Sequence, residues 1–202
     1  MSTRIGATIV TALITGTLLQ LIAQASKPAS EPSVVHYTAD NRLDFPSDYR
    51  EWVFLSAGRG MTYGPSANPN GPPLFDNGFV NPAAYQEFVK SGRWPDKSMF
   101  VLEIRKAATE GSINRGGQFQ KDLVAVEVEV KDTQKFADTD GWAYFGFGNT
   151  REPAGQVPKT QDCYSCHGKN TATEHTFVQF YPTLIDIAKT HKTFREDTGL
   201  GK

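Results

Sequence analysis

The sequence predicts an α+β fold, mainly an antiparallel β-sheet with a few short helices, and two observations support it. Residues 123–130 have a valine at every second position, and the residues between them change from apolar to acidic, the pattern of a strand with one buried face. Further short apolar segments, bounded by Gly, Pro and Asn, indicate more strands at 53–55, 74–80, 99–104 and 142–147. The chain has no internal repeat, and these segments add up to a sheet rather than a helical bundle.

The N-terminal half places strands, a long loop and one helix in sequence. Pro46 suits the first position of a short helical turn that runs into the strand at 53–55. Residues 59–73 are rich in Gly, Pro and Asn and form a long loop, and loops of that length in a compact domain are usually functional or disordered. Asn81 then caps a helix whose first residue is a proline, and Gly92 lies just past its end.

The strand at 123–130 is the clearest element of the C-terminal half. Residues 108–117 contain glycines and precede it as a hairpin or a wider loop. A last helix is expected at 177–189, interrupted at Pro182. Alternation divides the strand into one face with Val124, Val126, Val128 and Val130 and another with Leu123, Ala125, Glu127 and Glu129.

The N-terminus has the pattern of an export signal. Arg4 provides a minimal positive charge, residues 5–23 are largely apolar and uncharged, and residues 23–25 (Ala-Gln-Ala) offer a small-x-small cleavage site. The alternative is a transmembrane anchor, because the apolar segment is marginally long enough to span a bilayer. We expect a signal peptide over residues 1–25, cleaved near Ala25, which places the mature protein in the periplasm or outside the cell.

The rest of the chain fits one domain. Residues 26–42 are polar, contain prolines and show no periodicity, so we expect a flexible leader there. Residues 43–190 contain the predicted elements and have the length of a single domain, and residues 191–202 form a polar tail. The formal net charge of -1 gives no sign of the basic face that nucleic acid requires.

The chemistry of the chain concentrates in residues 163–167, Cys-Tyr-Ser-Cys-His. The chain has only 2 cysteines, Cys163 and Cys166, and His167 follows the second directly. This is the attachment signature of a c-type haem, in which the thiols bond to the haem vinyl groups and the histidine is the proximal ligand of the iron. The motif therefore predicts covalently bound haem c, with these three residues holding the cofactor and His167 its iron.

Other chemistries also use such a cysteine pair. A redox disulfide usually opens the first helix of a βαβ unit, and no such unit precedes the motif. A zinc site needs two more ligands, and His175 and His191 are the only imidazoles nearby. With both cysteines assigned to haem, no disulfide is left to stabilise an exported domain. We expect the apoprotein to be poorly folded, since a cofactor that binds only the native state stabilises that state.

Several blocks of the sequence resemble the cytochrome P460 family, in the family's order and over roughly residues 43–188. The haem motif alone is generic, whereas the blocks in this order are specific. The blocks are Pro46-x-x-Tyr49-Arg50-x-Trp52-Val53, Val80-Asn81-Pro82-x-x-Tyr85, Gly92-x-Trp94, residues 126–132, Gly141-Trp142-Ala143, the haem motif and residues 177–184.

The resemblance implies a mostly antiparallel β fold with one c-type haem, so that residues 43–190 would be a cytochrome P460-like haem c domain. It also implies that His167 is the proximal ligand, that the opposite face of the iron is open and that the protein is a homodimer. The founding activity of the family is the oxidation of hydroxylamine. A related branch, the β-type cytochromes c′, shares the fold and binds small gases.

One position departs from the hydroxylamine-oxidising members, in which a lysine on a distal strand bonds covalently to the porphyrin. Alignment of residues 99–104 with that strand places Leu102 at the position of the lysine, and leucine cannot form this bond. Lys97 and Lys106 lie outside the aligned position, and a register slip that used either would turn the apolar set of the strand to the wrong face. We therefore expect neither the cross-link nor its hydroxylamine chemistry.

Strand alternation then predicts an apolar distal pocket around Leu102, which shares its face with Phe100 and Ile104. Met99 points to the other face, so Met61 in the long loop is the better candidate for a sixth iron ligand. The remaining histidines are less suitable, and a five-coordinate iron is the leading hypothesis. Those histidines are His36 in the leader, His175 in the proximal segment and His191 in the tail, and the candidate partners of the haem propionates are Arg59, Arg93 and Arg105.

Three more residues are assigned to the distal side by alignment with the family. Phe75 and Phe79 belong to a segment near the iron, where their rings would crowd the distal pocket, or else they are ordinary sheet core. Glu127 matches a glutamate of the family pattern and either relays protons, as a catalytic residue, or faces water. Both alternatives stay open at this point.

The expected function is to bind small gaseous or nitrogen-oxide ligands such as NO and CO, or to exchange single electrons with a redox protein partner. An apolar pocket without a hydrogen-bond donor favours this function, because charge that develops on a bound oxygen would find no stabilising partner. The alternative is a haem-dependent oxidoreductase of the cytochrome P460 type, with hydroxylamine oxidation or peroxidase-like chemistry. That chemistry needs a base near the iron, for which Glu127 and Asp76 are available. A third class of function is a structural protein with a buried, inert haem.

Overall fold

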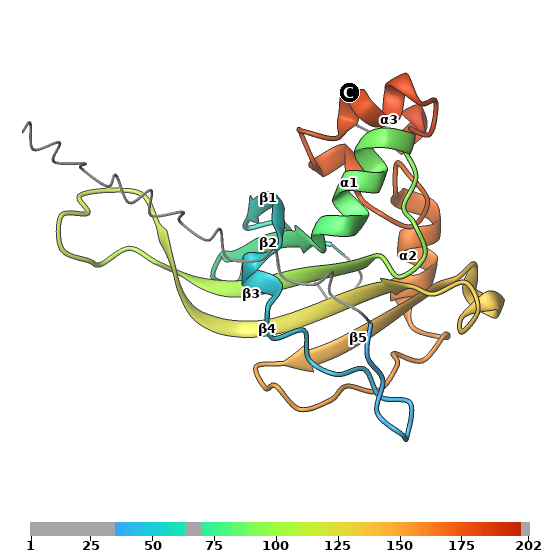
Figure 1. Ribbon diagram of the computed structural model, residues 1–202. Coiled ribbons are helices and arrows are strands. Elements are labelled where there is room, and N and C mark those ends of the chain that lie inside the picture. The colour runs from blue at the N-terminus through green and yellow to red at the C-terminus, as the bar shows by residue number, and fades with distance from the viewer. Residues whose placement is uncertain (1–34, 64–69, 199–202) are drawn as a thin grey trace, which may run out of the picture.

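A five-stranded antiparallel sheet organises the chain, of which the computed structural model describes residues 35–63 and 70–198 (Figure 1). Its strands lie side by side in chain order, and each pairs antiparallel with the next. The predicted α+β fold, mainly antiparallel sheet, is therefore confirmed. The strands are β1 (Val53–Arg59), β2 (Leu74–Val80), β3 (Met99–Ala108), β4 (Phe119–Lys131) and β5 (Trp142–Gly148).

The helices of the described residues are short. Helix α1 begins after Asn81 and ends at Gly92, whose φ of 68° is a left-handed conformation that glycine adopts without strain. No helix in residues 35–63 and 70–198 combines the length and the apolar character needed to cross a membrane. The α-helices are α1 (Pro82–Ser91), α2 (Asp162–Asn170) and α3 (Ile185–Thr190), and the 3₁₀ turns are η1 (Tyr49–Glu51), η2 (Ala137–Thr139), η3 (Val178–Phe180) and η4 (Glu196–Thr198).

The helix predicted at 177–189 is replaced by the turn η3 and the separate helix α3. Pro182 lies between them, where it lacks the backbone N–H that a continuous helix needs. The haem motif itself lies on α2, a helix that the sequence pattern did not indicate.

The two faces of the sheet have different covers (Figure 1). The helical face is covered by α1, η3 and α3, and it contributes Leu55, Val80, Phe100 and Trp142 to one core cluster. The loop face is covered by the N-terminal segment, with Val35 and Leu43, and by the segment that contains Ala154. It contributes Met99, Val101, Val126, Val128, Val130, Ala143, Phe145 and Phe147 to a second cluster.

A β-bulge changes the side-chain alternation predicted for β4. Ile104 pairs with Ala125, but the next residue of β3, Arg105, pairs with Leu123, so Val124 is left out of the register. Leu123 consequently packs against the cluster of the loop face, where alternation had placed Val124. The prediction for the rest of the strand is correct from Val126 onwards.

The terminal boundaries differ from those expected. The predicted signal peptide, residues 1–25, lies outside the described residues. Residues 35–42 belong to the fold rather than to a flexible leader, because Val35 is buried and Tyr37 packs against the loop-face cluster. At the other end, Phe194 of the predicted polar tail packs against the helical-face cluster. Hydrophobic periodicity could not predict these contacts, because each is made by a single apolar residue in an otherwise polar segment.

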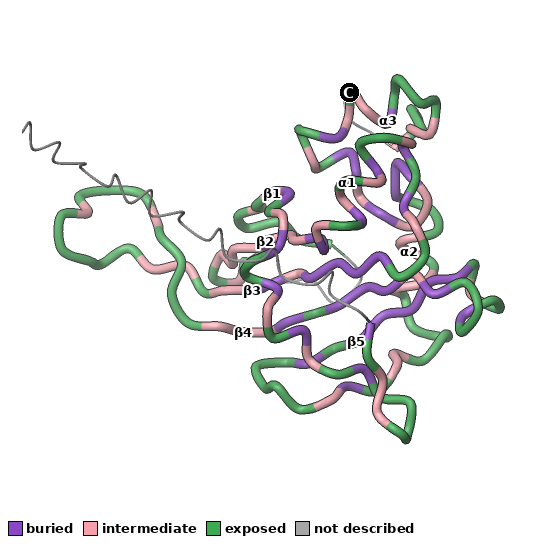
Figure 2. Tube along the Cα trace, in the orientation of Figure 1, coloured by how far each residue is buried: buried purple, intermediate pink, exposed green. Residues whose placement is uncertain are grey.

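The hairpin of β3 and β4 extends well beyond the body of the molecule (Figure 1). Figure 2 shows that its tip is exposed while the middle of both strands is buried. The buried stretch of these strands is the part that lies under α2 and positions the candidate site.

Candidate haem site

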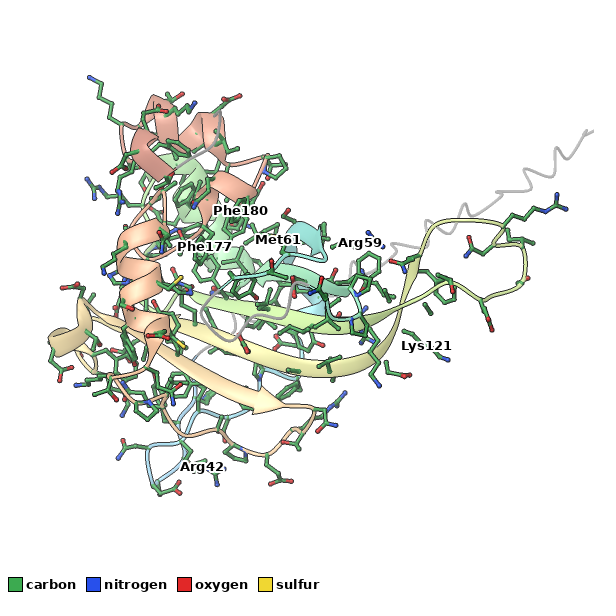
Figure 3. All side chains as sticks on the ribbon, turned by 180° about the vertical axis from the view of Figure 1, so that it is seen from behind. Arg42, Arg59, Met61, Lys121, Phe177 and Phe180 are labelled. Atoms are coloured by element: carbon green, nitrogen blue, oxygen red, sulfur yellow. The ribbon has the colours of Figure 1, made fainter. Side chains whose placement is uncertain are left out.

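Helix α2 presents the haem motif toward the helical face of the sheet. Cys163 and Cys166 are three residues apart on this helix, so their side chains lie on the same side. Both are partly buried free thiols. His167 lies one residue further on, with its ring packed edge-on or tilted against Tyr144 and Phe177 at centroid distances of 4.6 and 4.7 Å. Phe177 lies next to α2 in Figure 3.

One hydrogen bond fixes the orientation of the His167 ring. Its Nδ1 lies 2.7 Å from the backbone carbonyl oxygen of His175. A carbonyl only accepts, so Nδ1 carries the proton and donates it. The other ring nitrogen, Nε2, is then the one with a free lone pair. This is the usual arrangement of a metal-ligating histidine, whose second nitrogen is held by a backbone carbonyl.

The turn that carries this carbonyl is anchored to β4. Lys131 donates to the carboxylate of Glu174 at 2.6 Å and to the backbone oxygen of Trp94 at 2.7 Å. Glu174 has a φ of 53°, a left-handed conformation that is uncommon outside glycine, and Thr171 donates to its carbonyl at 2.7 Å. The ion pair is mostly buried and holds the turn in a strained conformation next to His167.

A buried carboxylate lies on the sheet side of the same imidazole. Glu129 is 9% exposed, and its Oε1 is 3.4 Å from Nδ1 of His167. Burial alone would lower the pKa of His167, but the negative charge of Glu129 outweighs burial and raises it. Burial of Tyr144, the cross-strand neighbour of Glu129, raises the pKa of its phenol, and the same negative charge adds to the effect.

Leu102 lies on the helical face of β3, two residues along the strand from Phe100, the partner of Glu129. Its cross-strand partners are Gly78 on β2 and Glu127 on β4, and Glu127 pairs in turn with Gly146 on β5. A side chain built at Gly146 would meet nothing within 4 Å. Gly146 thus leaves space above the sheet beside Glu127, whereas a side chain at Gly78, beside Leu102, would contact Leu55 and Tyr181.

Acidic and phenolic groups gather around this space. Burial raises the pKa of Glu127, although the side chain retains solvent access, and His167 partly offsets this increase. Burial also raises the pKa of Asp76, with a contribution from the charge of Glu127. The pKa of the Tyr63 phenol is raised as well, by partial burial of this half-exposed side chain and by electrostatic interactions with Asp76, Glu127 and Cys166. The pocket around Leu102 is therefore more polar than the sequence predicted.

The two aromatic residues assigned to the distal side, Phe75 and Phe79, lie on the loop face of the sheet, where they are placed as sheet core, the second of the two alternatives. Phe79 packs with the loop-face cluster, and its ring contacts Tyr49 and Phe54 at centroid distances of 5.7 and 5.6 Å. Phe75 pairs with Arg105 and lies four residues before Phe79 on the same unbroken strand, so it shares the loop face. The helical face of β2 is formed instead by the residues that alternate with Phe75 and Phe79 along the strand.

The structure also places the candidate sixth ligands. Met99 is buried in the loop-face cluster. The ring of His175 stacks on Trp142 at 5.7 Å, and His191 lies against Gly92 at the end of α1. Met61 is the candidate on the helical face, because its sulfur lies over Gly58 beside Asp76 (Figure 3).

Other predicted charges have partners away from this space. Arg105 donates to the carboxylate of Glu103 on the loop face, at 2.8 Å from Nε, and Arg59 donates to the side-chain oxygen of Gln118. Both arginines thus already have hydrogen-bond partners in this arrangement. Lys97 and Lys106 pair with Asp132 and Asp122, respectively.

The residues present fit a c-type haem. Two free thiols lie one helical turn apart, an imidazole next to them has its Nδ1 fixed and its Nε2 free, and Gly146 leaves room above the sheet beside Glu127. Sequence reasoning found the thiols and His167 from the motif and Leu102 from the alignment. It missed Glu129 and the carbonyl of His175, although the spacing of Glu127 and Glu129 already placed both glutamates on one face.

Comparison with known families gives one match. The family model described as Cytochrome P460 matches residues 46–178, which cover most of the described chain. The search of curated proteins gives no match.

Proposed function

Because the chain belongs to the cytochrome P460 family, which implies haem and iron, we propose that it is an exported c-type haem protein with a five-coordinate iron. It binds small gaseous ligands such as NO and CO or transfers single electrons. The haem supplies the iron that binds the gas or changes oxidation state. Thioether bonds from Cys163 and Cys166 attach it, and His167 is the proximal ligand.

The observation that carries this proposal is the fixed His167 ring beside the thiols. Its Nδ1 is engaged by the carbonyl of His175 at 2.7 Å, which leaves Nε2 to ligate iron. A redox disulfide gives no reason for that preorganised tautomer, whereas a metal that His167 ligates, haem iron included, uses it. The arrangement supports the attachment chemistry that the motif predicts.

The positions of the other soft or imidazole ligands support a five-coordinate iron. Met99, His175 and His191 are each packed elsewhere. Met61 lies in an exposed part of the loop after β1, where a stable iron bond would require this segment to order over the haem. We therefore expect the iron to be open on the side opposite His167, as gas binding requires.

The alternative is a haem-dependent oxidoreductase, for hydroxylamine or peroxide, and one observation favours it. Asp76 and Glu127 both lie on the helical face with raised pKa values, caused mainly by burial. A carboxyl group with a raised pKa near a reacting centre is suited to proton transfer at neutral pH. Leu102 at the position of the family's cross-linking lysine argues against the hydroxylamine branch.

Attachment is tested by replacing the thiols. The double variant Cys163→Ala/Cys166→Ala, produced with haem maturation, should lose haem staining on a denaturing gel. Ser165→Ala, an exposed position between the cysteines, is the matched control and should retain the stain. Covalent haem in the double variant would refute the proposed attachment.

Absorption spectra of the ferric and reduced protein, with and without NO, test the state of the iron. We expect a high-spin c-type spectrum that shifts when NO is added and that is unchanged in Met61→Leu. A low-spin spectrum that Met61→Leu converts to high-spin would identify Met61 as a sixth ligand and overturn the five-coordinate assignment. Hydroxylamine turnover that Glu127→Gln abolishes would replace the proposal by the oxidoreductase alternative.

The site of action and the partners are part of the same proposal. Haem attachment takes place outside the cytoplasm, which agrees with the signal-peptide pattern of residues 1–25. The homodimer rests on the family resemblance, and a redox protein partner would be needed for electron transfer. Size-exclusion chromatography with light scattering tests the dimer, and fractionation of cells tests the export.

A further inference from the structure

The oxygen Oε1 of Glu129 is a buried carboxylate oxygen that accepts no hydrogen bond within the described residues. Such an oxygen is costly, because a buried polar atom without a partner loses its hydration and gains nothing in exchange. Glu129 lies on β4 between Phe100 of β3 and Tyr144 of β5, and its side chain is only 10% exposed. Its position therefore calls for an explanation beyond folding.

The donor beside this oxygen is the proximal imidazole. Nδ1 of His167 lies 3.4 Å from Oε1, while the same nitrogen already donates to the carbonyl of His175 at 2.7 Å. The carbonyl thus takes the hydrogen bond, and the carboxylate stands next to the ring as a second acceptor and an unneutralised charge. In a buried setting this charge acts on the imidazole with little screening.

We infer that Glu129 is a positioning residue that tunes the haem iron through His167. Its carboxylate polarises the Nδ1–H bond, gives the imidazole partial imidazolate character and makes Nε2 a stronger donor to iron. A stronger donor stabilises ferric over ferrous iron, so Glu129 lowers the reduction potential. This inference rests on the proposed function, because it assumes that His167 ligates iron.

Glu127 provides a matched comparison on the same strand. It lies two residues away on the same face and its charge also reaches His167, but its side chain retains solvent access. Water around Glu127 screens its charge, whereas Glu129 is buried against the ring. Removing the charge at 129 should therefore move the potential further than removing it at 127.

The experiment is a potentiometric titration of the haem-loaded protein and of Glu129→Gln, Glu129→Asp and Glu127→Gln. We expect Glu129→Gln to shift the ferric-to-ferrous equilibrium about tenfold toward ferrous iron, a rise of about 59 mV for one electron. Glu129→Asp, which keeps the charge further from the ring, should shift it less, and Glu127→Gln least of the three. Equal potentials for Glu129→Gln and the wild type would overturn the inference.

A second readout separates tuning from packing. The iron–histidine stretching band in the resonance Raman spectrum of the reduced protein should fall in frequency in Glu129→Gln and stay unchanged in Glu127→Gln. An unchanged band in Glu129→Gln would overturn the inference even if the potential moved. A failure of the proposed function would be seen separately, in the wild-type protein and before any variant is made. The wild type would then lack covalent haem, or its haem would not be ligated by His167.

Discussion

Two glutamates are buried on neighbouring strands of the same sheet, and their surroundings are opposite. Glu103 of β3 faces the loop side and is 1% exposed, with hydrogen bonds from Tyr49 at 2.5 Å, from Arg105 at 2.8 and 3.0 Å, and from Asn77 at 3.2 Å, as well as from Arg50. Glu129 of β4 faces the helical side and has one oxygen without a partner.

This difference separates a structural carboxylate from a functional one. Burial would raise the pKa of Glu103, but the hydrogen bonds from Arg105, Tyr49 and Arg50 outweigh burial and lower it to about 2. A carboxylate with all its acceptor sites filled by donors stabilises the fold and is chemically inert. A carboxylate with an unfilled site next to the proximal histidine keeps its charge available to the cofactor.

The largest effect on stability is expected at Glu103. Glu103→Gln keeps the shape of the side chain but replaces charged hydrogen bonds with weaker neutral ones, and its amide N–H groups face other donors. We expect the free energy of unfolding of the haem-loaded protein to fall by about 3 kcal/mol, measured by denaturant titration. The reduction potential should be unchanged, because Glu103 lies on the face opposite the haem site. A loss below about 1 kcal/mol would show that the network is not structural.

The lowered pKa of Glu103 also makes the stability of the protein depend on pH. This pKa is about 2 in the folded protein and 4.5 in the unfolded reference, so the unfolded state takes up protons first. The stabilisation is complete above pH 4.5 and is lost as pH falls toward about 2. At about 1.4 kcal/mol per pH unit the loss amounts to about 3 kcal/mol.

The measurement for this prediction is the difference in unfolding free energy between wild type and Glu103→Gln as a function of pH. The difference should narrow steadily through this acid window, because the variant has no carboxylate to protonate. A difference that stays constant between neutral and acid pH would contradict the assignment.

A smaller effect is expected at the ion pair that supports the His175 carbonyl. Lys131→Met leaves the carboxylate of Glu174 partly buried without its cation and should cost about 2 kcal/mol of stability. The double variant Lys131→Met/Glu174→Gln should recover part of this loss, which a double-mutant cycle measures. Lys189→Met removes a lysine from an exposed pair and serves as the control, with a loss below about 1 kcal/mol. Equal losses in both lysine variants would contradict the structural role of Lys131.

The smallest effect on stability is expected at Glu129. Glu129→Gln removes a buried charge whose Oε1 accepts no hydrogen bond, so little is lost on the folded side. We expect the unfolding free energy to change by less than about 1 kcal/mol, measured in the same denaturant titration as for Glu103→Gln. A loss as large as that of Glu103→Gln would make both glutamates structural and remove the contrast between the two faces.

Local sequence patterns were enough to predict the strands, the cap and end of α1 and the haem motif. Each depends on local chemistry: alternation for β4, a proline after Asn81 and a glycine at the left-handed position 92 for the helix, and two cysteines next to a histidine for the motif. The sequence also indicated that Glu127 and Glu129 share a face.

Contacts between distant parts of the chain set which segments cover each face of the sheet and which glutamate is buried beside His167. Alignment with the family placed Phe79 near the iron, but it could not show that the N-terminal segment covers the face on which Phe79 lies and that α1, η3 and α3 cover the other. The bulge at Val124 likewise depends on pairing with β3. The carbonyl of His175 is a backbone group that every residue has, and its role comes from a turn held by Lys131 of a distant strand. These contacts join residues far apart in the chain, and no local pattern encodes them.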